Sequence, residues 1–225
     1  MVDLSRFRNT LVIAPHPDDE VLGAGGTIAR LAANGCTVKV VVVTRARTGP
    51  GEVPSEVYEE ASAVHRILGV DETVFWDFPT AELDAVAHRR LNAALADVVA
   101  RAVPDAVFVP FVGDLHLDHA AVFRSALVAA RPIQPLYPRS ILAYECLSET
   151  NWNAPYLTPN FVPNLFIDIA DFLSTKLAAM EAYASQNRAF PHERSLHTIE
   201  ALARLRGSTV HRQAAEAFVV LREVV

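Results

Sequence analysis

Residues 11–20 read Leu-Val-Ile-Ala-Pro-His-Pro-Asp-Asp-Glu, and this stretch decides the fold. Its first four residues form an apolar run that predicts a buried strand, and a helix-like segment follows over 21–34. A strand that ends in an imidazole and three carboxylates places charge at the carboxyl end of a sheet, where open α/β sheets bind their ligands. His16 and Asp19 are three positions apart in a turn, so both side chains can face one point. They offer two of the three protein ligands of a catalytic zinc site.

The third ligand has a candidate in a second cluster, Gly-Asp-Leu-His-Leu-Asp-His at 113–119. This cluster follows the apolar run 106–111, which predicts another strand. If the two strands lie side by side, their carboxyl ends bring both clusters together. The first cluster alone could be a helix-capping turn with solvated acidic side chains. Two independent His/Asp strand ends are hard to explain by packing, so we favour a site.

Strand-like and helix-like segments alternate along the chain, and this alternation with right-handed crossovers predicts a parallel sheet. We therefore expect an α/β, Rossmann-like, three-layer fold with a mostly parallel sheet flanked by helices, and an active site at the carboxyl ends of the strands. Glycines 23, 25 and 26 indicate a close backbone approach to the sheet or the site. The predicted strands are 11–14, 37–44, 73–76, 106–111, 141–145, 164–169 and 217–225, and the predicted helices are 21–34, 55–69, 84–103, 120–131, 171–185 (capped by Asp171) and 195–206.

Length and composition indicate a single domain over 1–225 with a full core, because 51% of the residues are hydrophobic and 20% are charged. A net charge of −6 gives no basic field, so we expect no nucleic-acid partner. The two cysteines, Cys36 and Cys146, are too few for a disulfide framework, and we expect both to be reduced. No apolar run reaches the length of a membrane span, and the first residues lack a signal-peptide core, so we expect a cytoplasmic enzyme.

The two motifs together resemble the LmbE-like or PIG-L family of zinc-dependent N-deacetylases, and the resemblance spans nearly the whole chain. Supporting similarities are Gly25-Gly26-Thr27, the strand 141–145, Arg194-Ser195 and Arg206-Gly207. The resemblance implies a zinc-dependent hydrolase that removes an acetyl group from the 2-acetamido group of an N-acetylglucosamine-like sugar or glycoconjugate. It also implies a possible homo-oligomer, since relatives often form trimers or hexamers.

On this interpretation His16, Asp19 and His119 bind zinc and leave a position open for a water molecule, which attacks the amide. Asp18 is the general base, and His116 either stabilises the oxyanion or supplies a proton to the amine. Asp118 is expected to orient an imidazole from outside the metal shell. Asp114 and Glu20 either support the site in the same way or cap a helix. A mixed nitrogen and oxygen shell suits zinc, and ferrous iron, cobalt or manganese could also occupy it.

Contacts with the substrate are predicted at Arg45 and Arg47 and at Trp152, which lies in the long loop 148–163. The arginines could instead be solvated, and the tryptophan could anchor the loop to the body. Two positions depart from the family pattern, because Val57-Tyr58 stand where many relatives have a sugar-contacting arginine and Thr80-Ala81 where they often have Asp-Gly.

Two other functions remain to be compared with a sugar deacetylase. The first is a metal-dependent amidase acting on a different amide, such as a thiol-conjugate or a formamido sugar. The second is a nucleotide-binding module without catalysis. The second is disfavoured because no Gly-x-Gly-x-x-Gly follows the first strand, and the carboxylates at the start of the helix repel phosphate.

Overall fold

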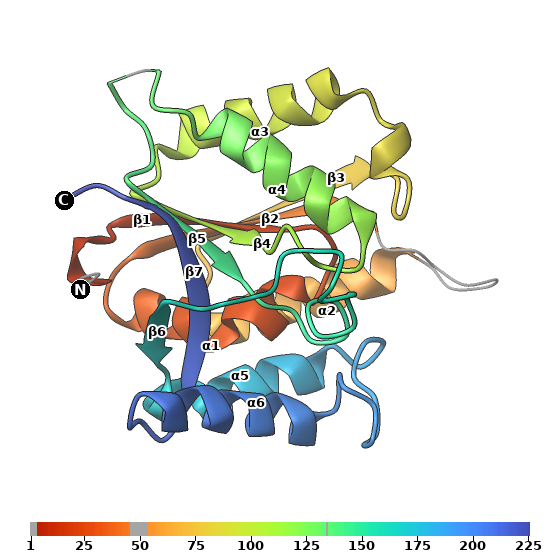
Figure 1. Ribbon diagram of the computed structural model, residues 1–225, viewed down its shortest axis with the longest axis vertical. Coiled ribbons are helices and arrows are strands. Elements are labelled where there is room, and N and C mark those ends of the chain that lie inside the picture. Colours follow the sequence, from red (N-terminus) through yellow and green to blue (C-terminus); the bar gives the residue numbers. More distant parts are fainter. Residues whose placement is uncertain (1–3, 46–53, 134) are drawn as a thin grey trace.

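A seven-stranded sheet forms the centre of the computed structural model, which describes residues 4–45, 54–133 and 135–225 (Figure 1). The strand order is β3-β2-β1-β4-β5-β7-β6; the first five strands in the chain run parallel, β7 pairs antiparallel with β5, and β6 pairs antiparallel with β7. This confirms the predicted mostly parallel α/β sheet. The strands are β1 (Asn9–Ala14), β2 (Thr37–Thr44), β3 (Glu72–Phe78), β4 (Ala106–Pro110), β5 (Ser140–Tyr144), β6 (Leu165–Asp168) and β7 (Ala215–Glu223). The helices are α1 (Asp19–Ala33), α2 (Pro54–Leu68), α3 (His88–Ala102), α4 (Leu117–Ala129), α5 (Leu173–Ala182) and α6 (Leu196–Thr209).

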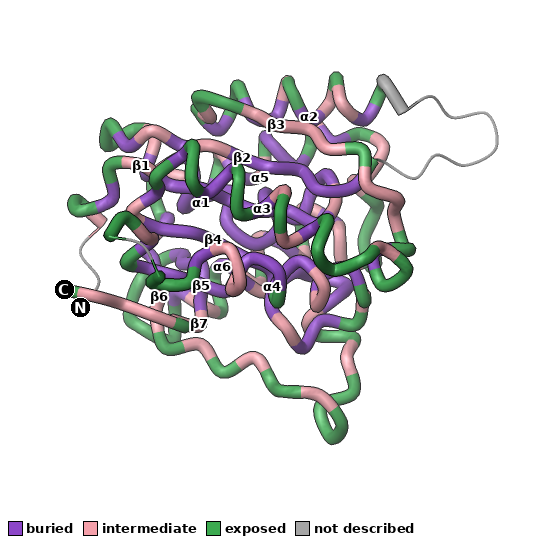
Figure 2. Tube along the Cα trace, turned by 90° about the horizontal axis from the view of Figure 1, so that it is seen from above, coloured by how far each residue is buried: buried purple, intermediate pink, exposed green. Residues whose placement is uncertain are grey.

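Helices cover both faces of the sheet, with α3 and α4 on one side and α1, α2, α5 and α6 on the other (Figure 1). The strands supply an apolar cluster to each face because successive side chains point in opposite directions. Val12 and Val40 pack in the cluster on the α1 side, whereas Ile13 and Val41 pack in the cluster on the α3 side. The central strands are accordingly buried along most of their length (Figure 2). None of the described helices combines the length and the apolar character needed to cross a lipid bilayer.

Two glycines of α1 allow the helix to lie directly against neighbouring side chains, as predicted. A Cβ atom on Gly23 would lie 2.2 Å from the ring of Tyr144, and one on Gly26 would lie 2.7 Å from Ile169. The Tyr144 ring cannot easily move, because it is fully buried and its hydroxyl donates to the carbonyl oxygen of Ile13 at 2.9 Å. Because Gly23 and Gly26 have no side chains, α1 can lie this close to Tyr144 of β5 and to Ile169.

A buried ion pair between α5 and the carboxyl-terminal strand β7 also hydrogen-bonds to the backbone of α1. Lys176 and Glu216 lie 2.6 Å apart and are almost completely buried. The Glu216 carboxylate accepts from the backbone N–H groups of Gly26 and Thr27, and the Lys176 ammonium donates to the carbonyl oxygen of Leu22. Both charges are thus paired and hydrogen-bonded, which is the condition for tolerating charge in a protein interior.

Two details of the helix prediction differ from the structure. The helix predicted over 84–103 begins only at His88, after a separate 3₁₀ turn at Leu83–Ala85. The prediction that Asp171 caps the next-to-last helix was wrong, because a 3₁₀ turn at Ala170–Phe172 precedes α5, whose first flanking residue makes no side-chain cap. Instead, Asp168 accepts the Ala170 N–H at 3.0 Å and initiates that turn.

Replacing Gly23 with alanine tests the close approach of α1 to the sheet. The added methyl group meets the Tyr144 ring, so Gly23→Ala is expected to lower the free energy of unfolding by about 1–3 kcal/mol. Gly25→Ala is the matched control, because its Cβ would lie 3.3 Å from the nearest side-chain atoms and alanine favours a helix. Urea denaturation of both variants measures the difference, and an equal effect of the two substitutions would contradict this packing.

Candidate active site

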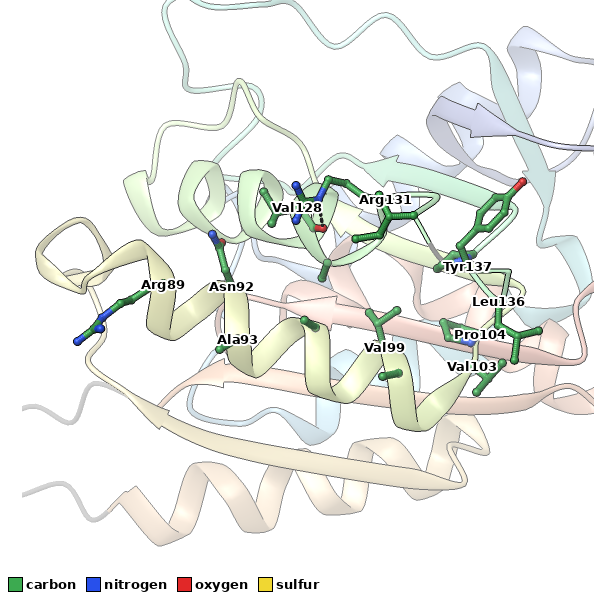
Figure 3. Close-up of a pocket in the computed structure, with 15 residues that line it drawn as sticks. Arg89, Asn92, Ala93, Val99, Val103, Pro104, Val128, Arg131, Leu136 and Tyr137 are labelled. Atoms are coloured by element: carbon green, nitrogen blue, oxygen red, sulfur yellow. Dashed lines mark hydrogen bonds between the residues drawn. The ribbon is translucent and has the colours of Figure 1, made fainter.

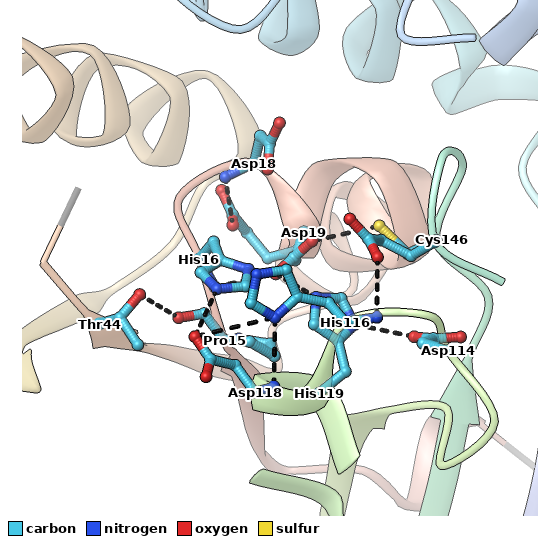
Figure 4. Close-up of polar contacts among 12 residues, drawn as sticks. Pro15, His16, Asp18, Asp19, Thr44, Asp114, His116, Asp118, His119 and Cys146 are labelled. Carbon is cyan, nitrogen blue, oxygen red and sulfur yellow. Dashed lines mark hydrogen bonds and ion pairs between the residues drawn. The ribbon is translucent and has the colours of Figure 1, made fainter. Parts of the chain in front are cut away.

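The two motifs meet because β1 and β4 are neighbouring parallel strands. Thr10 pairs with Ala106 and Val12 pairs with Phe108, so both strands end at the same edge of the sheet. The first motif continues from β1 through a turn into the first two residues of α1, and the second begins after β4 and ends in the first turn of α4, which contains Asp118 and His119. Side chains that are about a hundred positions apart in the sequence therefore converge at one point (Figure 4).

His16, Asp19 and His119 form one cluster that could hold a metal ion. Each offers a ligand atom, and these three atoms all lie within 4.8 Å of one another. The Asp19 Oδ2 atom is 3.3 Å from His16 Nδ1 and 3.2 Å from His119 Nε2. The structure thus brings together the three residues predicted as metal ligands, with two nitrogen atoms and one carboxylate oxygen facing a common point.

His119 provides the test of whether this cluster fits a metal. Its ring is completely buried, and Nε2 makes no hydrogen bond among the described residues, although Asp19 Oδ2 lies at ion-pair distance, 3.2 Å away. The other nitrogen, Nδ1, is held by Asp114 Oδ2 at 2.8 Å. A buried nitrogen without a partner is costly in a protein interior unless a ligand completes it. A histidine fixed by a carboxylate on one nitrogen and free on the other is the usual arrangement of a metal ligand.

His16 has the same arrangement with the opposite nitrogens. Its Nε2 lies 3.0 Å from Asp118 Oδ2, and its Nδ1 faces Asp19. Asp118 is fixed in turn by the backbone N–H groups of Ala81 and Leu83. Asp118 therefore holds an imidazole as expected, and Asp114 does the same for His119.

The charges of this cluster perturb one another strongly. Burial lowers the pKa of His119, but Asp19 and Asp114 outweigh burial and raise it well above its usual range. Burial raises the pKa of Asp19, but the positive charges of His119 and His16 outweigh burial and lower it well below its usual range. Cys146 adds a donor, because its thiol lies 3.2 Å from Asp19 Oδ1. The carboxylate of Asp19 is thus held in its ionised, ligating form.

A second cluster with metal-ligand spacing consists of His16, His116 and Asp118. Its carboxylate already accepts two backbone N–H groups, and His116 Nδ1 accepts from the backbone N–H of Asp118 at 3.1 Å. These atoms already have partners, whereas the first cluster contains an unpartnered buried nitrogen. The first cluster is therefore the better metal site.

Asp18 lies beside the cluster but faces Arg194. Its Oδ2 accepts from Arg194 Nη1 at 3.0 Å, and Arg194 also contacts Ser148 and Gln186. Burial raises the pKa of the Asp18 carboxyl to about 8, and the charge of Arg194 opposes this increase. The backbone of Asp18 is left-handed, with φ at 105°, a conformation that non-glycine residues adopt mainly at strained or functional positions.

The Glu20 side chain hydrogen-bonds to the backbone of the turn that contains Asp18. Its Oε2 accepts the backbone N–H of Asp18 at 3.2 Å, while its Oε1 lies 3.1 Å from His65 Nε2 and accepts from the Tyr183 hydroxyl at 2.7 Å. His65, Glu20 and Tyr183 are all buried. Glu20 is therefore a supporting residue, and helices α2 and α5 contribute to the position of Asp18 through it.

A cavity of about 170 Å³ opens beside the cluster, lined by His16, Pro17, Asp18, Val57, Thr80, His116, Glu149, Gln186 and Arg194. Asp18, the expected general base, and His116 both line this cavity, which lies next to the candidate metal ligands. Val57 and Thr80, the two positions that depart from the family pattern, both line it.

Among the described residues, the structure places only one of the three predicted substrate contacts, Trp152, near the site. Arg45 lines neither this cavity nor the adjoining one, and its guanidinium lies 3.6 Å from Asp77. Arg47 lies outside the described residues. Trp152 lines a neighbouring cavity that shares three residues with the first. Arg194 and Glu149 reach the site, although sequence reasoning gave neither of them a role there; the pair Arg194-Ser195 was only a supporting similarity.

A larger cavity of about 660 Å³ lies between α3, α4 and the segment before β5 (Figure 3). Val103 and Pro104 precede β4, and Tyr137 and Pro138 precede β5, so this cavity lies toward the amino ends of those strands. Among the described residues that line it there is no carboxylate, imidazole or thiol. The two His/Asp clusters lie instead at the carboxyl ends of β1 and β4.

Comparison with known proteins identifies the family. The model of the GlcNAc-PI de-N-acetylase family, PIG-L, matches residues 11–130, which include both motifs. The chain belongs to this family. The resemblance proposed from the two motifs is thereby confirmed, and the PIG-L family places the chain among deacetylase enzymes.

Similar proteins cover most of the chain. An uncharacterized deacetylase of Escherichia coli, YaiS, is 32% identical over 80% of this chain and 93% of its own length. The diacetylchitobiose deacetylase of Thermococcus kodakarensis is 29% identical over 83% of this chain and 72% of its own length. The crystal structure of a conserved protein from Thermus thermophilus superposes with a TM-score of 0.80 at 30% identity, covering 96% of both chains. The PIG-L fold is thus shared over nearly the full length.

Metal content distinguishes the two candidate clusters. We expect the full-length protein, stripped with a chelator and reloaded with zinc, to retain about one ion per chain. His119→Ala should reduce bound zinc to background, because it removes the unpartnered nitrogen, whereas His116→Ala should retain zinc. His88→Ala, at an exposed position of α3, is the control. Metal analysis after dialysis gives the result, and loss of zinc in His116→Ala with retention in His119→Ala would favour the other cluster.

Asp114 provides a test of the arrangement around His119. Asp114→Ala removes the acceptor that fixes Nδ1, and such partners of metal-binding histidines typically contribute 10–100-fold in metal affinity. We expect zinc affinity to fall by about that factor, measured by competition with a chromophoric chelator. Asp97→Ala removes an exposed carboxylate from α3 and should leave the affinity unchanged. Equal affinities of Asp114→Ala and the unaltered protein would show that Asp114 does not orient the ligand.

Proposed function

We propose that the chain is a zinc-dependent hydrolase that removes the acetyl group from the 2-acetamido group of an N-acetylglucosamine-like sugar or glycoconjugate. The observation that carries this proposal is the buried, unpartnered Nε2 of His119, which faces Asp19 and His16 beside a cavity that also holds Asp18 and His116. The names of PIG-L relatives support the substrate class, since one of them is a diacetylchitobiose deacetylase.

His16, Asp19 and His119 would hold the metal, and a shell of two imidazoles and one carboxylate suits zinc. Zinc bound there would polarise a carbonyl group and lower the pKa of water to about 7. The choice of zinc over other divalent transition metals is part of the proposal.

Asp18 is proposed to take the proton of the attacking water on its carboxylate and to pass it to the amine nitrogen when the amide breaks. Arg194 donates to Asp18 Oδ2, and its positive charge offsets part of the increase to about 8 that burial causes in the pKa of this carboxyl. The contact with Arg194 also orients the Asp18 carboxylate, and Glu20 accepts a hydrogen bond from the backbone N–H of Asp18. A single oxygen of Asp18 is thus held by Arg194, and the carboxylate borders the cavity.

His116 is proposed to stabilise the negative charge that develops on the amide oxygen. Burial and the charge of His16 lower its pKa, which favours the neutral ring. Its Nδ1 accepts the backbone N–H of Asp118, so the proton of a neutral ring lies on Nε2. His116 lines the cavity, and an Nε2–H group directed into it would be a hydrogen-bond donor for an oxyanion. This favours the oxyanion role over the transfer of a proton to the amine.

The remaining expectations about the protein stay proposals. A small-molecule substrate, the absence of a nucleic-acid partner, a homo-oligomeric assembly and a cytoplasmic location follow from the sequence and the resemblance. The alternative function is hydrolysis of a different amide, such as a thiol-conjugate or a formamido sugar, by the same residues.

An acetate-release assay with Asp18→Asn tests the function. We expect the zinc-loaded protein to deacetylate diacetylchitobiose or another N-acetylglucosaminide, and to lose this activity with chelator. Asp18→Asn should lose roughly 100-fold or more in kcat and retain zinc. Asparagine tolerates the left-handed backbone at this position, so the fold should be kept. Asp84→Asn, outside the site, is the control. Activity confined to formamido sugars or thiol-conjugates would favour the alternative, and full activity of Asp18→Asn would refute the role of the base.

A further inference from the structure

A second cavity, of about 150 Å³, adjoins the cavity beside the candidate metal ligands. The two share Glu149, Gln186 and Arg194, so a molecule that enters the first can extend directly into the second. Trp152, Arg188 and His192 line only the second cavity. None of these three side chains has a part in the proposed hydrolysis.

Arg188 leaves the second cavity with an uncompensated positive charge. Its Nη1 donates to the backbone carbonyl oxygens of Ser185 and Asn187, at 2.6 and 3.0 Å. Within the described ranges, no carboxylate lies within ion-pair distance of its guanidinium. Carbonyl groups position the arginine but do not neutralise it. A free cation beside the site contrasts with a chain whose net charge is −6.

The other charged groups that border this cavity already have partners. Arg194 is shared among Asp18, Ser148 and Gln186. Glu149 accepts from the backbone N–H of His116 and lies 3.9 Å from Arg194. The charge that remains available to a ligand is therefore that of Arg188.

Trp152 adds a ring surface next to this charge. It is half exposed, and its ring lies 6.4 Å from that of His192 in an edge-on arrangement. A half-exposed aromatic ring beside an arginine provides both apolar contact and attraction for an anionic group. The second cavity thus differs in character from the first, because Asp18 lines only the first cavity and Arg188 lines only the second, whereas Glu149 lines both.

We propose that the second cavity binds a negatively charged group, a carboxylate or a phosphate, on the substituent that the amino sugar carries. The inference rests on the proposed function, because it assumes that the acetamido group occupies the first cavity. The preferred substrate is then an N-acetylated amino sugar with an anionic substituent rather than a neutral oligosaccharide. Arg188 is a specificity-determining residue that does not touch the reacting atoms.

Matched substrates isolate the charge. The carboxymethyl glycoside of N-acetylglucosamine and its carbamoylmethyl analogue have nearly the same shape, but only the first is anionic. We expect kcat/KM for acetate release to be roughly three- to tenfold higher for the carboxymethyl glycoside, the range of one partly exposed charged contact. The advantage should lie in KM, and it should shrink as sodium chloride is raised, because salt screens the attraction. N-acetylglucosamine 1-phosphate, compared with the methyl glycoside, tests phosphate as the source of charge.

Substitution of Arg188 assigns the effect to this cavity. Arg188→Gln should bring the two matched glycosides to about the same kcat/KM while leaving the carbamoylmethyl glycoside unchanged, and Arg188→Lys should retain part of the preference. Arg204→Gln is the control for net charge, since Arg204 is exposed on α6 and pairs with Glu200.

The outcomes separate the inference from the proposed function. An anionic preference of either the carboxylate or the phosphate pair that Arg188→Gln abolishes and Arg204→Gln keeps supports the inference. Equal turnover of charged and neutral substrates, or a preference that survives Arg188→Gln, overturns it while leaving deacetylation intact. If no acetamido sugar is hydrolysed, the proposed function fails. Calorimetric titration of the two glycosides then tests the inference by itself, and equal affinities overturn it.

Discussion

The parallel pairing of β1 with β4 is the constraint on which the site depends. Each strand ends in a polar motif, and neither motif alone holds all three candidate metal ligands, because the first contains His16 and Asp19 and the second contains His119. A one-residue slip between the two strands would turn every side chain to the opposite face and separate the motifs. The side chains of β1 and β4 pack in this register into the apolar clusters on the two faces of the sheet, so core packing also fixes the relative position of the two motifs.

Buried charge is the second constraint, and it is met by giving each acidic side chain defined partners. Asp114 and Asp118 hold imidazoles, Asp18 faces Arg194, and Glu20 bonds Tyr183. Removing water from so many carboxylates is costly, and these contacts offset the cost while fixing the direction of each side chain. The same contacts therefore do two things. They stabilise the buried acidic side chains, and they orient the groups that the proposed hydrolysis uses.

The sequence carried enough information for the sheet, the motifs and their convergence, because alternating segments and strand-end clusters are local patterns. It did not predict the polar contacts between the first motif and the carboxyl-terminal part of the chain. The pairing of Arg194 with Asp18 spans 176 positions, and that of Tyr183 with Glu20 spans 163, with no spacing rule to indicate either. The prediction that Asp171 caps α5 was also wrong, because Asp168 accepts the hydrogen bond that begins the turn before α5. Trp152 was selected for its loop alone, and only the folded chain places it in the second cavity.

The division of the site between chain segments has a consequence for how such proteins diversify. The stretch that matches the family model, 11–130, contains every candidate ligand together with Asp18 and His116, whereas Glu149, Trp152, Arg188 and Arg194 come from beyond it. Arg194 is the member of this later group that also bonds Asp18. Substitution of Trp152 or Arg188 would therefore alter the second cavity and leave every candidate ligand, Asp18 and His116 in place.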